Sequence, residues 1–301
     1  MRNIKKILVI GTGSISKRHT KNTLKIFDKK KINLKIYIFS NKIDRAKKFS
    51  KIFKKNIFIK IKKNDIKKIK FDYIIIACDI SQHIKWLKFF KKEKVKIFCE
   101  KPLVIEKKDI DWLNKNKFFF KNLFVGFQYR FSPVTIKLKS LIQKNLFGKL
   151  LLSSFEIGQD IKDWREGNNF KKEFAFGKTS KRKRSVIWEL CHDIDLMFYL
   201  IGSPNQFNGQ EDKIKNKKIY TKDFAHLVST FKNCSRAIIT QNMFSPVLYK
   251  NINLIFENKI INTDYIKGVI EIKSKNKIKK ITLKNDRNIS FIKELECFYN
   301  D

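Results

Sequence analysis

Short apolar runs alternate with amphipathic segments from residue 5 to about residue 130. The segments between the runs carry apolar residues at three- and four-residue spacing, the period of a helix with one buried face. The runs are apolar at consecutive positions, which is typical of strands covered by helices on both faces. This alternation predicts a doubly wound α/β sheet with parallel strands at residues 6–11, 35–39, 57–61, 72–78, 95–100 and 123–127.

The pattern changes after about residue 130, where longer stretches alternate apolar and polar side chains: residues 149–159, 224–233, 235–244, 251–258 and 269–284. A period of two, with short turns between the stretches, is typical of an antiparallel sheet. Helical patterns cover residues 134–148 and 186–202, and the second ends at Gly202 before Pro204, a common helix stop. We therefore expect a second, α+β domain with a mainly antiparallel open sheet.

The chain carries 68 Lys and Arg against 28 Asp and Glu, a formal net charge of +40. Such a charge makes nucleic acid a candidate partner. Arginine, which makes planar bidentate contacts with phosphate and guanine, is nevertheless scarce, and lysine is spread through nearly every segment. We predict attraction of anionic substrates and cofactors, but no specific nucleic-acid partner; residues 178–185 are the one local basic cluster.

Lysines interrupt every apolar run, so no window reaches the roughly 20 uncharged apolar residues of a membrane span. The N-terminal residues lead directly into a strand pattern, without the apolar core of a signal peptide. The five cysteines are widely separated and form no CxxC pair or Cys/His zinc pattern. These features predict a cytoplasmic protein with no membrane partner and no metal.

Gly11 and Gly13 stand directly after the first predicted strand, at the start of the first predicted helix. In a dinucleotide-binding fingerprint the first glycine permits a tight turn, and the second lets the backbone approach a pyrophosphate. The helix N-terminus, which begins with Ser14 and Ile15, then offers its N–H groups to the phosphates. Ser16 takes the place of the third glycine. We predict that Gly11, Gly13, Ser14 and Ile15 bind NAD or NADP.

The second predicted strand ends in Ser40, Asn41 and Lys42, with Arg45 one turn later. An NAD site usually carries an acidic residue here for the ribose 2′-hydroxyl, and the first acid in this segment is Asp44. Small and basic groups suit the 2′-phosphate of NADP instead. The alternative is that these residues are only the solvated start of a helix, so we expect NAD or NADP with a slight preference for NADP.

The fifth predicted strand ends in Glu100, Lys101 and Pro102. Ligands of an open α/β sheet bind beyond the carboxyl ends of the strands, so these residues fall on the predicted cofactor side. Proline restricts the backbone there and helps to hold the lysine amine in place. We expect Glu100 and Lys101 to lie beside the cofactor, with the Lys101 amine able to meet a substrate hydroxyl.

Four segments, IGTGSISKRH, CEKPL, VGFQYRFSP and ELCHDIDLMFYLIG, resemble the Gfo/Idh/MocA family of nicotinamide-dependent oxidoreductases in order and separation. The resemblance covers essentially the whole chain. It implies an NAD(P)-binding Rossmann domain, here residues 1–124, and a substrate-binding α+β domain, here residues 125–301. It also implies hydride transfer between a nicotinamide and a carbon of a sugar, polyol or related carbohydrate, and often a homo-oligomer.

Within this resemblance, Lys101 matches the lysine that hydrogen-bonds the reacting hydroxyl, and His192 matches the histidine that acts as general acid and base. Histidine ordinarily titrates at about pH 6.5, which suits proton exchange near neutrality. Glu189 and Asp195, three residues before and after His192, are expected on the same helix face, where either could orient the ring. The alternative is that His192 is a satisfied core histidine.

The resemblance also implies cofactor contacts at His83 and at Asp79, which replaces a proline of the relatives. Tyr129 and Arg130 match the strand that leaves the first domain, where Arg130 either lines the substrate pocket or ties the two domains together. Two further residues resemble a substrate-side loop of members from carbohydrate biosynthesis: Trp164 and Arg165.

Two features depart from the family pattern. Relatives carry a run of glycines before the helix with the histidine, whereas this chain has SKRKRSV. Lys183 and Arg184 there could grip an anionic substrate such as a sugar phosphate, sugar nucleotide or acidic sugar, or the change could mean that catalysis has been lost. Residues 289–301 resemble the start of the family's late helix and stop early, so we expect a chain that is either naturally short or a fragment.

We expect an NAD(P)-dependent oxidoreductase that acts on CH–OH groups of a carbohydrate-like substrate. The alternative is a catalytically inactive protein of the same fold that binds a dinucleotide or sugar and regulates a partner. The missing glycine run favours this alternative, and the presence of both Lys101 and His192 opposes it. A nucleic-acid-binding protein, an interpretation that rests on charge alone, ranks third.

Overall fold

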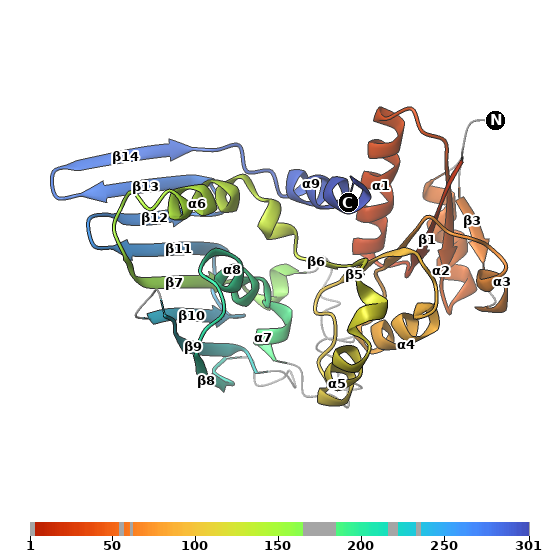
Figure 1. Ribbon diagram of the computed structural model, residues 1–301, viewed down its shortest axis with the longest axis horizontal. Helices are drawn as coiled ribbons and strands as arrows, with labels where there is room; N and C mark the ends of the chain where they lie inside the picture. Colours follow the sequence, from red (N-terminus) through yellow and green to blue (C-terminus); the bar gives the residue numbers. More distant parts are fainter. Residues whose placement is uncertain are drawn as a thin grey trace. The chain divides into compact units, whose positions relative to one another are not determined.

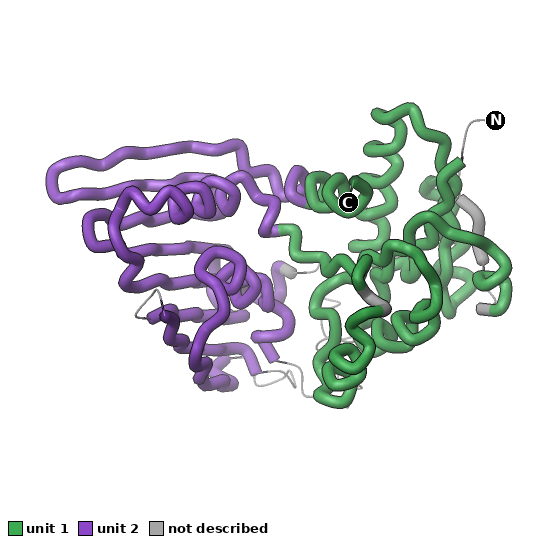
Figure 2. Tube along the Cα trace, viewed as in Figure 1, with its two compact units in different colours: residues 1–128, 291–301 green, residues 129–290 purple. Residues whose placement is uncertain are grey.

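The computed structural model describes residues 4–53, 57–60, 63–164, 185–215, 222–232 and 236–300. The chain divides into two compact units (Figure 2). The first comprises residues 1–128 and 291–301, and the second comprises residues 129–290. The boundary expected after residue 124 lies a few residues later, and the C-terminal residues group with the first unit, although the sequence pattern assigned them to the second.

The described strands of the first unit form a six-stranded, all-parallel sheet in the order β3-β2-β1-β4-β5-β6 (Figure 1). This confirms the doubly wound Rossmann sheet predicted from the apolar runs. The strands are β1 Lys5–Ile10, β2 Leu34–Phe39, β3 Ile57–Lys60, β4 Tyr73–Ile76, β5 Lys96–Glu100 and β6 Leu123–Gly126.

Side chains of successive residues in β1 enter opposite cores, which explains its continuous apolar run. Ile7 and Val9 pack in a cluster with α1 and α9, whereas Leu8 and Ile10 pack in a cluster with α4. The helices of this unit are α1 Ser14–Lys29, α2 Ile43–Ile52, α3 Lys63–Lys67, α4 Ile80–Phe90, α5 Lys107–Lys115 and the short 3-10 helix η1 Lys117–Phe120, with the end of α9 Arg287–Asn300.

The last turns of α9 supply core side chains to the first unit. Leu295, Phe298 and Tyr299 are buried in the cluster that also contains Ile7 and Val9. The Tyr299 hydroxyl shares a hydrogen bond of 2.7 Å with the hydroxyl of Thr23 on α1. The packing of aromatic side chains around this bond explains why the C-terminal residues group with residues 1–128.

The second unit contains an eight-stranded sheet in its described part, in the order β14-β13-β12-β11-β7-β10-β9-β8. Neighbouring strands run antiparallel except β7 and β10, which are parallel. This confirms the mainly antiparallel sheet. The strands are β7 Leu150–Gly158, β8 Gln206–Asp212, β9 Phe224–Thr230, β10 Arg236–Asn242, β11 Tyr249–Phe256, β12 Ile260–Asp264, β13 Val269–Ser274 and β14 Lys277–Thr282.

Helices α6 and α8 pack on this sheet through a shared apolar cluster (Figure 1). Val134 and Leu138 of α6 and Leu196 of α8 meet Phe155 and Ile252 of the sheet, and all five are fully buried. The helical elements of this unit are η2 Gln128–Phe131, which spans the unit boundary, α6 Pro133–Gln143, η3 Ile161–Trp164, α7 Val186–Glu189 and α8 His192–Leu200.

The single helix predicted over residues 186–202 is wrong in one respect, because the chain breaks it at Leu190 and Cys191. Leu190 leaves the helical region, with φ −101° and ψ 24°. Its carbonyl accepts a hydrogen bond of 2.7 Å from the side-chain amide of Gln241, a fully buried residue of β10. A partner distant in sequence thus takes the carbonyl, and α8 begins anew at His192.

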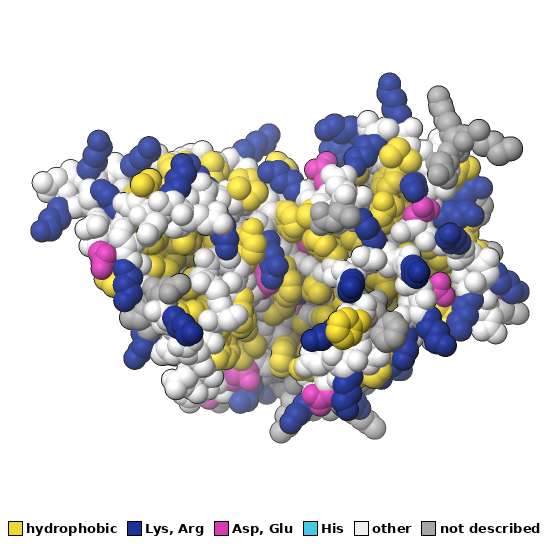
Figure 3. Space-filling model, viewed as in Figure 1, with side chains coloured by type: hydrophobic (Ala, Val, Ile, Leu, Met, Phe, Trp, Pro, Cys, Tyr) yellow, Lys and Arg dark blue, Asp and Glu magenta, His cyan; other side chains and the backbone are white. Residues whose placement is uncertain are grey.

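On the face shown in Figure 3, the Lys and Arg side chains of the described residues are scattered over both units rather than gathered over one element. This distribution agrees with the even spread of lysine along the sequence. In the described part of the chain, no helix combines the length and the apolar character that crossing a bilayer requires.

We predict that Asp72→Asn lowers the free energy of unfolding by about 1 kcal/mol at pH 7. Asp72 joins the starts of β4 and β1, since it accepts bonds of 2.9 Å from Lys5 Nζ and from the Lys6 N–H. Burial would raise the pKa of Asp72, but these bonds outweigh it and hold the pKa below its ordinary value. A lowered pKa stabilises the fold above about pH 4, and this contribution disappears as the carboxylate is protonated.

Urea unfolding at pH 7 and at pH 3 measures this effect. The difference between wild type and Asp72→Asn should be present at pH 7 and small at pH 3. Asp111→Asn, at an exposed position of α5, is the control and should change little at either pH. An equal loss at both pH values for Asp72→Asn would contradict the assignment to the carboxylate charge.

Candidate functional site

The turn after β1 requires glycine at position 11. Gly11 has a positive φ of 118°, and its N–H donates a hydrogen bond of 2.9 Å to the carbonyl of Phe39. A Cβ at this position would lie 2.3 Å from the carbonyl oxygen of Ala77. Glycine alone tolerates both the conformation and the contact.

Gly13 differs from Gly11 because the space around it is open. A Cβ there would meet nothing within 4 Å among the described atoms, and the residue is exposed. Gly13 is the N-cap residue of α1, no side chain caps the helix there, and its first turn contains no acidic residue. The first N–H groups, at Ser14 and Ile15, therefore face a region that an anion can enter.

Ser16 supplies a bond where the fingerprint usually has a third glycine. Its hydroxyl is fully buried and donates a hydrogen bond of 2.8 Å to the carbonyl of Ala77. The same carbonyl lies against Gly11. The side chain of Ser16 thus ties α1 to the end of β4 and does not project toward the phosphate turn.

The residues expected at the ribose end lie beside this turn. Ser40 follows β2, and its Oγ lies 3.5 Å from Oγ1 of Thr12. Thr12 is the residue between Gly11 and Gly13 in the sequence. The Lys42 N–H donates a 3.3 Å hydrogen bond to Ser40 Oγ. Three further candidates are exposed at the start of α2: Asn41, Lys42 and Arg45.

The carboxylate of Glu100 is engaged inside the first unit. Its Oε1 lies 2.5 Å from Nε2 of His19 on α1, and its Oε2 accepts a hydrogen bond of 3.2 Å from the Lys101 N–H. His19 is fully buried and Glu100 nearly so. Glu100 therefore links α1 to the segment that carries Lys101, which is half-buried. Sequence reasoning missed His19, although it lies five residues after Ser14 in the quoted motif.

His83 and Asp79 are likewise engaged in local structure. His83 is buried, with Nδ1 3.2 Å from the carbonyls of Pro102 and Leu103 and Nε2 3.2 Å from the carbonyl of Cys78. Burial lowers the pKa of His83, and so favours the neutral ring at pH 7. Asp79 is the N-cap of α4 and accepts a 2.9 Å bond from the Ser81 N–H.

His192 opens α8 in the second unit and is 9% exposed. The ring of Tyr129 packs edge-on against its imidazole, with ring centres 4.8 Å apart. Tyr129 and Arg130 lie in the short helix η2 rather than in the strand that the sequence suggested. Glu189 closes α7, so the prediction that Glu189 and His192 share one helix face is wrong.

Asp195 binds Arg130 and was expected to orient His192. The Arg130 guanidinium donates to both carboxylate oxygens, from Nε at 3.1 and 2.9 Å and also from Nη2. Burial raises the pKa of Asp195, and the Arg130 charge opposes that effect. This pair gives Arg130 a structural partner within the second unit. Of the remaining candidates, Trp164 ends η3, and Lys183, Arg184 and Arg165 lie outside the described residues.

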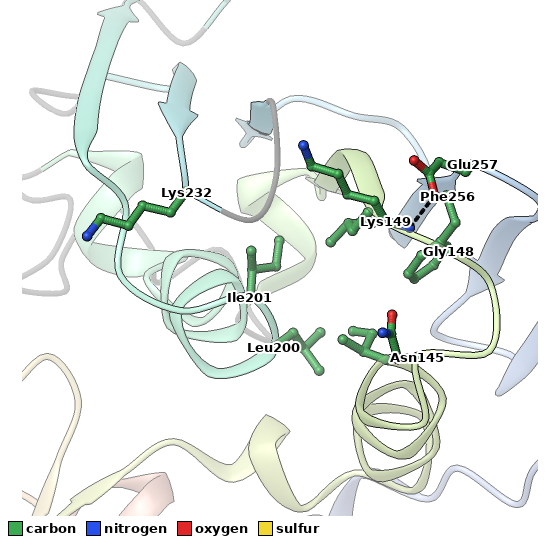
Figure 4. A pocket seen from close by; sticks show the side chains of 10 residues that line it. Asn145, Gly148, Lys149, Leu200, Ile201, Lys232, Phe256 and Glu257 are labelled. Carbon is green, nitrogen blue, oxygen red and sulfur yellow. Dashed lines mark hydrogen bonds between the residues drawn. The ribbon is translucent and has the colours of Figure 1, made fainter.

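The second unit contains a cavity of about 670 Å³ (Figure 4), and His192 is not among the residues that line it. Leu200 lines it at the end of α8, and His192 begins that helix, so the helical rise separates them by about 12 Å. The cavity is therefore not the place where His192 acts. Its lining residues are Ile142, Asn145, Gly148, Lys149, Leu150, Leu200, Ile201, Lys232, Phe256 and Glu257.

Within the described ranges, no group of three or more His, Cys, Asp and Glu side chains could hold a metal ion. The arrangement of the first unit points to another kind of ligand. A tight turn, an open helix N-terminus and small or basic side chains at the end of β2 suit the phosphates and ribose of a dinucleotide.

Residues 5–115 match the model of an oxidoreductase family with an NAD-binding Rossmann fold, Gfo/Idh/MocA. Over these residues the chain is similar to the NAD-binding Rossmann domain of that family. This match confirms the family resemblance seen in the sequence, and it covers the strands and helices that surround Gly11 and Gly13. A comparison with curated proteins finds no match.

Solved structures of oxidoreductases share the fold of the whole chain. One is levoglucosan dehydrogenase with NADH and levoglucosan (TM-score 0.82, 14% identity, 98% of this chain and 88% of that one). Another is an oxidoreductase from Agrobacterium radiobacter with NAD+, L-tartaric acid and magnesium (TM-score 0.81, 15% identity, 98% of this chain and 86% of that one). A third is UDP-N-acetylglucosamine 3-dehydrogenase from Acidithiobacillus ferrooxidans (TM-score 0.76, 17% identity, 99% of this chain and 88% of that one). At these identities the similarity establishes the fold.

We predict that Gly11→Ala lowers the free energy of unfolding by about 3 kcal/mol, because it adds both a strained φ and a backbone clash. Gly202→Ala is a matched control, since Gly202 has the same φ of 118° and nothing within 4 Å of its Cβ position. That variant should lose only about 1 kcal/mol. Denaturant unfolding of both variants measures the difference, and equal losses would contradict the role assigned to the Ala77 contact.

Proposed function

We propose that the chain is an NAD(P)-dependent oxidoreductase that transfers a hydride between the nicotinamide and a CH–OH carbon of a carbohydrate-like substrate. The observation that carries the proposal is the phosphate turn. Gly11 closes the turn against Ala77, Gly13 leaves it open, and the segment matches an NAD-binding oxidoreductase family. Two solved structures of the same fold are dehydrogenases of levoglucosan and of UDP-N-acetylglucosamine.

Lys101 is proposed to bind the reacting hydroxyl. It follows β5 at the carboxyl edge of the sheet, and the Glu100 carboxylate holds its backbone N–H. A side chain on a backbone that is itself held can place its charge reproducibly. The Lys101 ammonium would donate a hydrogen bond to the substrate oxygen and stabilise negative charge that develops there.

His192 is proposed to move the proton of that hydroxyl. In the oxidative direction its imidazole takes the proton from oxygen while the hydride leaves the attached carbon, so that the C–O single bond becomes a carbonyl. In the reductive direction it returns the proton. The nicotinamide, when bound, accepts or supplies the hydride.

Finer parts of the proposal concern the cofactor and the substrate. Ser40, Asn41, Lys42 and Arg45 supply small and basic groups rather than an acid at the end of β2, which favours NADP slightly over NAD. The net charge of +40 favours an anionic sugar derivative. The free thiols of Cys78 and Cys99 suit a reducing compartment such as the cytoplasm. A homo-oligomer, implied by the family resemblance, remains part of the proposal.

We predict that Lys101→Ala and His192→Ala each lower kcat by about 10² to 10⁴ while NAD(P)H still binds. Turnover is measured first on wild type with a panel of sugars, polyols, sugar phosphates and sugar nucleotides, using NAD(P)H or NAD(P)+. The matched controls are Lys96→Ala, at the opposite end of β5, and His226→Ala, an exposed histidine of β9 in the second unit. Both should keep near-normal turnover.

Full activity of Lys101→Ala or His192→Ala would reject the role given to that residue. Cofactor binding by wild type without turnover on any substrate would reject the enzyme proposal. It would favour a regulatory protein of the same fold.

A further inference from the structure

Two buried polar side chains of the sheet, from strands on either side of β7, reach the chain on either side of His192. Gln241 of β10 donates its amide hydrogen to the carbonyl of Leu190, two residues before His192. Lys250 of β11 forms an ion pair with Asp193, the residue directly after it. Gln241, Lys250 and Asp193 are all fully buried.

The Lys250–Asp193 pair requires an explanation other than stability. Taking an ammonium and a carboxylate out of water costs several kcal/mol per ion, and well-packed apolar residues often replace such pairs with no loss of stability. Among the described residues most charged side chains are at least partly exposed, whereas both members of this pair are 0% exposed. The geometry of the pair fixes one backbone segment, that of His192, relative to β11.

The Lys250 ammonium also reaches the aromatic ring that packs on His192. It lies 4.9 Å from the ring centre of Tyr129 and 5.5 Å from that of Tyr265, distances at which a cation is attracted to an aromatic face. Tyr129 in turn packs edge-on against His192, with the rings at 80°. Lys250 therefore contacts both the residue after His192 and the ring beside it.

Tyr129 is itself held in place. Its ring packs against Tyr265 at 5.5 Å and 89°, and its carbonyl accepts a 3.3 Å bond from the Tyr265 hydroxyl. That hydroxyl also shares a hydrogen bond of 2.7 Å with Thr135 of α6. Tyr265 thus holds both the ring and the backbone of Tyr129, and the Tyr129 ring in turn packs against the His192 ring.

We propose that Gln241 and Lys250 are positioning residues that set the location and ring orientation of His192. This inference rests on the proposed function, in which His192 moves a proton. Gln241 holds the break in the helix open before His192, and Lys250 holds Asp193 and Tyr129 after and beside it. Together they confine the imidazole at the start of α8, where a displacement of about 1 Å can cost a factor of about 10² in rate.

Two variants test the proposal without leaving one member of the buried ion pair unpaired. Gln241→Leu removes the bond to Leu190, and the double variant Asp193→Leu with Lys250→Met removes both charges while conserving approximate volume. The control is Thr23→Val, which removes a buried hydroxyl hydrogen bond to Tyr299 in the first unit. Thermal unfolding of each variant reports the loss of stability separately.

The first readout is NMR titration of the His192 ring, which needs no substrate. The chain has four histidines, so ¹³C-labelled histidine gives four ring signals, and His192→Gln assigns the relevant one. We expect both test variants to shift or broaden the His192 signal and to leave His19 and His83 unchanged. We also expect kcat to fall about 10- to 100-fold, with NAD(P)H affinity within twofold of wild type.

An unchanged His192 signal in both test variants would overturn the proposal. It would also be overturned if Thr23→Val moved that signal equally, because the effect would then be a general response to lost stability. If wild type turns over no substrate, the proposed function fails, and the NMR signal alone decides whether these residues position His192.

Discussion

The close approach of Gly11 to the Ala77 carbonyl is the contact on which the candidate cofactor site depends. The chain passes so near to β4 that a Cβ at position 11 would lie 2.3 Å from that oxygen. The same carbonyl accepts the Ser16 hydroxyl bond, so one backbone group at the end of β4 holds both the turn and the first helix. With the turn and α1 held in this way, the N–H groups after Gly13 can face an open region.

A second contact of the same kind connects α1 with the end of β5. The carboxylate of Glu100 lies between His19 and the Lys101 N–H, so the helix that offers its N-terminus to phosphate is also tied to the proposed catalytic lysine. In the second unit, buried polar side chains of the sheet hold the chain around His192. In both units apolar packing builds the layers, and a few buried polar bonds hold the segments that carry the proposed catalytic residues.

The period of the hydrophobic pattern was sufficient to predict both sheets. A strand covered on both faces is apolar at consecutive positions, and a strand covered on one face alternates apolar and polar residues. The pattern did not predict β8 or β12, because β8 is mostly exposed and polar and β12 is short. The break before His192 was not predictable from local sequence, since the Leu190 carbonyl binds Gln241, 51 residues away. The Arg130–Asp195 pair and the grouping of α9 with the first unit likewise depend on contacts between distant residues. The positions of Gly11, Gly13 and Ser40 were predictable because they follow from a short turn between adjacent elements.

Calorimetric titration of NADPH and NADH into wild type and Gly13→Val tests the central claim most directly. Gly13 has an extended conformation that any residue can adopt, and its Cβ position is open, so valine should leave the fold and its thermal stability unchanged. We predict one nucleotide bound per wild-type chain and at least tenfold weaker binding by Gly13→Val, because the side chain occupies the approach to the helix N-terminus. No binding by wild type, or equal binding by a correctly folded Gly13→Val, would contradict the assignment of this turn as the dinucleotide site.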